Sequence, residues 1–238
     1  MESLVNPPST SLALIPGYML DETLWNTFKN YLPEGWSTAD ASLGDGQTIR
    51  EIAANIADRL PLRFVLVGFS LGGYVARQLA ADFPERVDAL IIIASSLRDD
   101  TEQQKKVKRQ ALQAISAKSF KGLSNATIAQ SLHPRLAADA EKIAFIKAMS
   151  QRLGYSALVT QSQLERKDVP ASSIRCPTLV IASADDALRS REEAEELVAA
   201  IPGAELQVID DSGHMIPLEQ PQVLAETIVH WLSGKHVS

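Results

Sequence analysis

The chain has 238 residues, a formal net charge of −6 and an ordinary hydrophobic share of 45%, which suits one sizeable domain. The acidic balance argues against a nucleic-acid partner, because nucleic-acid binders usually carry a basic patch. No apolar run approaches the roughly 18 residues needed to span a membrane, so we expect no membrane association. Cys176 is the only cysteine, which excludes an internal disulfide and a cysteine-rich zinc site. With an N-terminal stretch unlike a signal peptide, these features favour a cytoplasmic location.

Short apolar runs of strand length recur along the chain. They cover residues 12–15, 64–67, 87–93, 178–182 and 206–209, with a weaker candidate at 37–41. Most are apolar throughout, as expected for parallel strands buried on both faces. Segments of helix length lie between them, at 21–32, 48–60, 71–83 and 190–201. This alternation predicts an α/β fold, a mostly parallel sheet flanked by helices.

The region from 97 to 168 interrupts this alternation. It opens with the charged run RDDTEQQKKVKRQ, which we interpret as a solvated helix surface. Ile143, Ile146, Met149 and Leu153 follow at spacings of three and four, which places them on one helix face. We therefore predict a helical insertion at 97–168 between two parts of a core at 1–96 and 169–238.

A serine stands between glycines at the end of one predicted strand, in the stretch LVGFSLGGY. The pattern Gly68-x-Ser70-x-Gly72 alone arises often by chance, and Ser70 could merely cap the next helix. However, a strand runs into it and a helix leaves it, which is the arrangement of a nucleophile elbow. The turn there is so sharp that side chains at 68 and 72 would collide. The context therefore predicts that Ser70 is a nucleophile.

A serine nucleophile needs a histidine to take its proton. His214 lies in the stretch DDSGHMIPLEQP, after the last predicted strand, where polar catalytic side chains belong. His230 lies within an apolar helix pattern, His133 within the insertion, and His236 in the tail. His214 is the predicted base.

An acid that orients the imidazole should come from a loop between the serine and the histidine. Asp185 and Asp186 directly follow the strand predicted at 178–182, and either could serve. Asp99 and Asp100, which follow the strand at 87–93, are further alternatives.

The stretches GFSLGG, PERVDALIIIAS, IRCPTLVIASADD and DSGHMIPLEQP resemble the α/β-hydrolase superfamily over nearly the whole chain. The resemblance is strongest to small carboxylesterases and enol-lactonase-like hydrolases with a helical cap. It implies that Asp186 is the acid, because Ser183 stands where relatives have a glycine three residues before it. It also implies that the N–H groups of Tyr18 and Leu71 form an oxyanion hole. Relatives usually have His-Gly where this chain has Pro16-Gly17.

This resemblance implies a serine hydrolase that cleaves a small-molecule ester, lactone or thioester without a metal or cofactor. Alternatives are a C–C bond hydrolase or perhydrolase with the same three residues, or a hydrolase-like protein that only binds a small ligand. We expect a substrate pocket lined by apolar side chains of the insertion, including Ile146, Met149, Leu153 and the helix face at Val107. The sequence does not indicate an oligomeric state.

Overall fold

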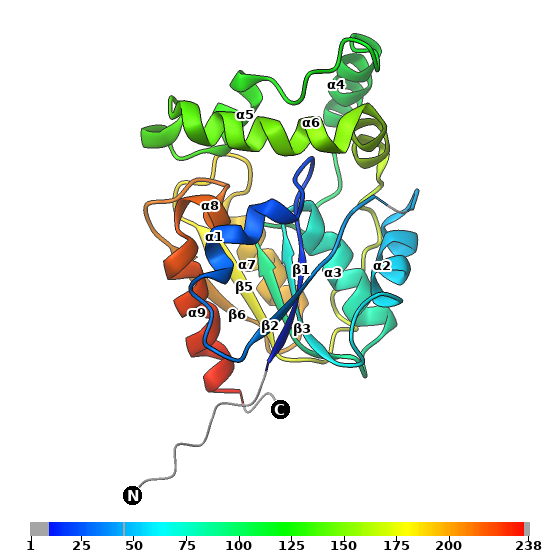
Figure 1. Cartoon of the computed structure of the whole chain (residues 1–238). Helices are drawn as coiled ribbons and strands as arrows, with labels where there is room; N and C mark the ends of the chain where they lie inside the picture. Colours follow the sequence, from blue (N-terminus) through cyan, green and yellow to red (C-terminus); the bar gives the residue numbers. More distant parts are fainter. Residues whose placement is uncertain (1–9, 45, 236–238) are drawn as a thin grey trace, which may run out of the picture.

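The computed structural model describes residues 10–44 and 46–235 (Figure 1); His236 lies outside this part. The six strands in it form one sheet of order β2-β1-β3-β4-β5-β6, and every neighbouring pair is parallel. They are β1 (Ser11–Ile15), β2 (Ser37–Asp40), β3 (Phe64–Phe69), β4 (Val87–Ile93), β5 (Thr178–Ser183) and β6 (Glu205–Ile209). The predicted α/β fold is confirmed. The bounds predicted for β4 agree with the structure, and the other strands were predicted with errors of one or two residues at their ends, the largest at β3, predicted as 64–67.

Helices cover both faces of the sheet. Successive side chains of β1 alternate between two apolar cores: Leu12 and Leu14 belong to one, Ala13 and Ile15 to the other. The first core includes residues of α1 (Asn26–Lys29) and α9 (Pro221–Ser233), and the second those of α2 (Ile49–Ala57), α3 (Leu71–Asp82) and α7 (Arg191–Ala200). The short helix α8 (Ile216–Glu219) precedes α9. This burial on both faces explains why the strands read as continuous apolar runs.

Local signals fixed the start of several helices. The Ser190 side chain accepts from Glu193 N, and the Glu193 carboxylate accepts from Ser190 N, so a capping box opens α7. The segment at 21–32 was predicted as one helix, but its helical part is shorter and divided in two. It forms the 3₁₀ turn η1 (Glu22–Trp25) followed by α1.

The insertion is helical, and it contains no strand between residues 97 and 168. Its elements are α4 (Glu102–Gln113), α5 (Asn125–Ser131), the 3₁₀ turn η2 (Pro134–Leu136) and α6 (Ala140–Gln163). They lie together across one end of the sheet (Figure 1). Gly154 takes φ 77° and kinks α6. Gln161 and Ser162, beyond this kink, contact the loop after β1.

A fully buried arginine joins the insertion to the sheet. Arg77 of α3 is 0% exposed and donates to the carbonyls of Ser96, Val169 and Pro170. Burial lowers the pKa of its guanidinium to about 10. Arg77 thus bonds to backbone at both ends of the helical segment that lies between β4 and β5.

Candidate active site

Ser70 lies at the junction of β3 and α3. It takes φ 52° and ψ −112°, a conformation that costs a non-glycine residue on the order of 1–3 kcal/mol. Its N–H donates to the Ile93 carbonyl at 2.8 Å, and its own carbonyl accepts from the Ser95 hydroxyl at 2.8 Å. These bonds to the end of β4 hold the strained turn in place.

The two glycines of the motif are needed because backbone passes close to each. A Cβ at Gly68 would lie 2.5 Å from the Gly72 carbonyl oxygen, and a Cβ at Gly72 would lie 2.4 Å from the Pro16 carbonyl oxygen. The collision expected from the sequence is therefore real at both positions. The loop after β1 packs directly against the turn that carries Ser70.

A chain of hydrogen bonds links Ser70, His214 and Asp186. His214 Nε2 lies 2.9 Å from Ser70 Oγ, and His214 Nδ1 lies 2.7 Å from Asp186 Oδ2. Asp186 Oδ1 also accepts from the backbone N–H groups of Leu188 and Arg189. Its side chain is only 1% exposed. With Nδ1–H donated to the carboxylate, Nε2 is free to accept the serine proton.

The other candidate acids lie elsewhere. Asp185 is 48% exposed, and its Oδ2 lies 3.5 Å from His133 Nε2. Asp99 pairs with Lys105, and Asp100 with Lys108 and Arg166. Of the four acids considered from the sequence, only Asp186 contacts His214.

Two polar side chains whose roles the sequence did not reveal, those of Glu219 and Ser183, hold the loops of the acid and the histidine. The Glu219 carboxylate accepts from the N–H groups of Gly213 and Met215, which flank His214, and from that of His133 in the insertion. The Ser183 hydroxyl donates to the Ser212 carbonyl. Glu219 lies within the quoted stretch DSGHMIPLEQP, but only the folded loop shows that it binds backbone on both sides of the histidine.

The loop after β1 is held by the second half of α6. Met19, at φ 56°, donates its N–H to Gln161 Oε1 at 2.7 Å, and both residues are buried. The Tyr18 hydroxyl and the Ser162 hydroxyl share a hydrogen bond of 2.7 Å. Neither the N–H of Tyr18 nor that of Leu71 donates to another residue in the described part of the chain. The role of Gln161 was not predicted either, because nothing in the sequence relates it to Met19.

A cavity of about 390 Å³ opens over Ser70 and His214. It is lined by Tyr18, Leu20, Phe69, Ser70, Asp100, Gln104, Lys108, Leu123, Thr127, Ile128, Ser131, Ile146, Arg166, Leu188, Arg189, His214 and Met215. Of the predicted pocket residues, Ile146 lines this cavity. Met149 instead lies 0% exposed in the apolar core, and Leu153 does not line the cavity.

The cavity exposes more apolar than polar surface, as expected, but the helix face predicted at Val107 does not line it. Val107 is 52% exposed on α4, whereas Gln104 and Lys108, one helical turn apart, line the cavity. The helix therefore turns a polar face to the site. The apolar residues of α4 are too few to form a buried face, and none of its residues is buried.

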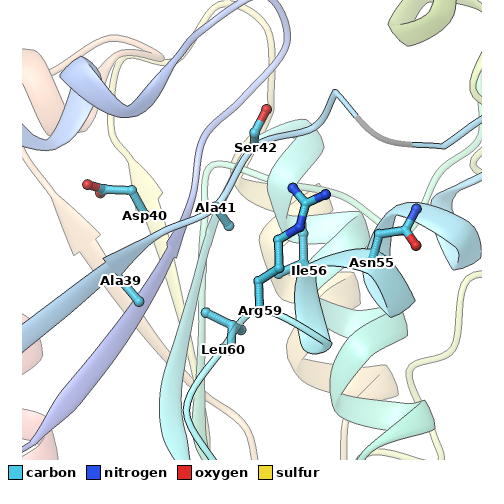
Figure 2. Close-up of a pocket in the computed structure, with 8 residues that line it drawn as sticks. All are labelled: Ala39, Asp40, Ala41, Ser42, Asn55, Ile56, Arg59 and Leu60. Atoms are coloured by element: carbon cyan, nitrogen blue, oxygen red, sulfur yellow. The ribbon is translucent and has the colours of Figure 1, made fainter.

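A second, smaller pocket of about 130 Å³ lies between β2 and the end of α2 (Figure 2). It shares no lining residue with the larger cavity. Asp40, Asn55 and Arg59 are among the residues that line it. It is separate from the Ser70 site.

Among residues 10–44 and 46–235, no three His, Cys, Asp or Glu side chains are grouped so that they could hold a metal ion. In the same residues, no helix combines the length and apolar character required to cross a bilayer. Cys176 is partly buried, and this burial raises the pKa of its thiol to about 11, so it stays protonated.

A nucleophile elbow at the carboxyl end of a parallel strand, followed along the chain by an acid and a histidine, defines the class of protein. The chain belongs to the alpha/beta hydrolase family, whose model matches residues 14–227, and it is a hydrolase. It is 34% identical over 192 residues to the "Putative carbamate hydrolase RutD" of Klebsiella pneumoniae. These aligned residues make up 77% of this chain and 68% of that protein.

Solved structures agree in fold. An esterase from Thermogutta terrifontis matches with a TM-score of 0.83 at 25% identity, over 96% of this chain and 91% of that one. The enol-lactonase from Burkholderia xenovorans LB400 also gives a TM-score of 0.83, over 95% of this chain and 92% of that one, at 17% identity. The second match shows the fold alone.

Proposed function

We propose that this hydrolase cleaves a carboxylic ester, lactone or thioester of a small or medium acyl group through an acyl-enzyme on Ser70. The observation that carries the proposal is the hydrogen-bonded chain from Asp186 through His214 to Ser70 Oγ, at the wall of a cavity. In the first step, His214 Nε2 takes the hydroxyl proton as Oγ attacks the substrate carbonyl carbon. Asp186 stabilises the imidazolium that forms.

The negative charge that develops on the carbonyl oxygen needs donors. The N–H groups of Tyr18 and Leu71, which no described residue uses, are our candidates, and the N-terminus of α3 adds its dipole. The tetrahedral intermediate collapses as His214 returns the proton to the leaving alcohol or thiol. Water, deprotonated by His214, then attacks the acyl-enzyme and releases the acid and free Ser70.

The insertion at 97–168 would act as a cap over the reacting groups. Its residues Leu123, Ile128 and Ile146 line the cavity, whose volume of about 390 Å³ lies near the lower end of the usual range for ligand sites, about 300–1,000 Å³. This supports a small or medium acyl group. The absence of a second cysteine supports a cytoplasmic location, which stays a prediction.

A carbamate is the second candidate substrate class, because the relatives from Klebsiella carry that activity in their name. The same attack by Ser70 on a carbamate carbonyl would apply. A panel that contains 4-nitrophenyl butyrate, its thioester and an aryl carbamate separates these classes by kcat/KM.

The proposal is tested with a fluorophosphonate and 4-nitrophenyl butyrate. The probe should attach to the peptide that carries Ser70 and abolish turnover. Ser70→Ala and His214→Ala should each lower kcat by several orders of magnitude, up to about 10⁶-fold, and the double variant little further, because such residues act as a unit. Ser156→Ala, at an exposed serine on α6, is the control and should keep full activity. Turnover by Ser70→Ala near that of the unchanged chain would refute the acyl-enzyme.

A further inference from the structure

Three basic side chains line the cavity that contains Ser70. They are Lys108 of α4, Arg166 after α6 and Arg189 beside the Asp186 loop. Asp100 is the one acidic side chain in that lining. The surplus of positive charge contrasts with the whole chain, whose net charge is −6.

The internal contacts leave donors unused. Lys108 Nζ and Arg166 Nη1 share the carboxylate of Asp100, the latter at 3.0 Å. Arg189 Nη1 lies 3.2 Å from Oε1 of Glu193, a residue that does not line the cavity. Arg166 is only 8% exposed, yet its buried Nε has no hydrogen-bond partner in the described part of the chain, and its Nη2 makes no bond there. Nε is enclosed, so Nη2 is the unused nitrogen that a ligand in the cavity could reach. A guanidinium that is largely buried gains from such an acceptor, because burial deprives its N–H groups of water.

The three cations also act on one another. Burial is the largest cause of a lowered pKa at Lys108, and the charges of Arg166 and Arg189 add to it, against the opposing effect of Asp100. Arg166 further lies within electrostatic reach of the Tyr18 phenol. The three basic groups therefore lie near one another in the cavity, and Arg166 is the one that reaches Tyr18, the residue that we place in the oxyanion hole.

We propose that Lys108, Arg166 and Arg189 form a carboxylate-binding subsite, so that the preferred substrate is an ester that carries a free carboxylate away from the scissile bond. This inference rests on the proposed hydrolase activity. A purely structural role explains the cluster less well, because a single cation would neutralise Asp100. Gln104, which also lines the cavity, adds an uncharged donor on the same face of α4.

The probes are pairs that differ only in charge. On the acyl side they are mono-4-nitrophenyl glutarate and adipate, each against its methyl-capped diester. On the alcohol side they are the acetate esters of 3-(4-hydroxyphenyl)propanoate and of its methyl ester. The Ser70→Ala rate is subtracted as background, since dicarboxylate monoesters can also hydrolyse by themselves.

The expected result is that kcat/KM is about tenfold or more higher for the acid than for the methyl ester on one of the two sides. Lys108→Gln should lower this ratio about tenfold. Lys105→Gln is the matched control, because Lys105 lies on the same helix, pairs with Asp99 and does not line the cavity, and it should leave the ratio unchanged. Arg166→Gln, checked for folding by thermal denaturation, should act like Lys108→Gln.

Two failures are distinguishable. The carboxylate subsite would be overturned, and the proposed hydrolase spared, if Ser70-dependent turnover showed no preference for the acid in any pair. The same conclusion would follow if a preference existed but Lys108→Gln and Arg166→Gln left it intact. No Ser70-dependent turnover of any probe would overturn both.

Discussion

Replacing Gln161 by methionine should slow the chemical step although Gln161 is not expected to touch the substrate. Its Oε1 accepts the Met19 N–H at 2.7 Å, with Gln161 1% and Met19 0% exposed. Methionine keeps the length of the side chain but offers no comparable acceptor. The Met19 N–H would then be buried without a partner, and the loop that presents the Tyr18 N–H would relax away from its present course.

The size of the effect follows from this bond. A buried donor left unsatisfied costs about 1–3 kcal/mol. The loop can avoid this cost by moving, and the Tyr18 N–H then loses its position. The transition state would lose up to about 1–3 kcal/mol of stabilisation, which corresponds to a roughly 5- to 150-fold lower kcat. Because a positioned N–H acts mainly on the developing oxyanion, kcat should fall and KM should change little.

The assay measures kcat and KM on 4-nitrophenyl butyrate, normalised to active sites titrated with a fluorophosphonate. This removes any loss of folded protein, which a purely structural role would cause. Gln163→Met, two residues along α6 at an exposed position, is the control. An unchanged normalised kcat in Gln161→Met would refute the claim that this residue positions the oxyanion loop.

Two further predictions concern single carboxylates. Asp186→Asn should keep the fold and lower kcat by about 10⁴-fold, because an amide favours the wrong histidine tautomer; Asp185→Asn should have far less effect, and the opposite ranking of kcat would move the role to Asp185. Burial alone would raise the pKa of Asp21, but hydrogen bonds from Arg152 and Thr23 outweigh it and lower this pKa below the ordinary 3.8. The stabilisation by this carboxylate is therefore complete above about pH 5 and lost as the pH falls through the folded pKa. Urea midpoints at pH 7, 5, 4 and 3 should show Asp21→Asn less stable than the unchanged chain at high pH and the gap closing in acid; a gap that is constant over this range would contradict the assignment.

The sheet and the catalytic residues Ser70 and His214 could be predicted because short stretches of sequence are typical of each. Apolar runs such as 87–93 mark strands buried on both faces, and the glycines around Ser70 mark a turn that only small residues permit. The choice of Asp186 over Asp185 needed the family resemblance, since spacing alone left either possible. The structure separates them, because one carboxylate is buried against His214 and the other is half exposed.

The polar contacts that support the site could not be predicted. Gln161 bonds Met19 across 142 positions, and Glu219 bonds His133 across 86. The first pair depends on the kink of α6 at Gly154, and the second on the position of η2 near the loop that carries His214. The spacing of apolar residues along the chain predicts neither feature. The orientation of α4 failed for a related reason. A helix with no buried residue has no apolar face strong enough to reveal which side points at the site.

The departure at Pro16-Gly17, where relatives usually have His-Gly, can be judged from what holds this loop. The Pro16 carbonyl passes so close to Gly72 that a Cβ there would lie 2.4 Å away, and the Leu20 N–H closes a turn on the Gly17 carbonyl at 3.3 Å. Gln161 then fixes Met19. These contacts all involve backbone atoms of the loop, so none requires an imidazole at position 16. A proline, which has no N–H to donate and a restricted φ, therefore fits here without disturbing the path that leads to the Tyr18 N–H.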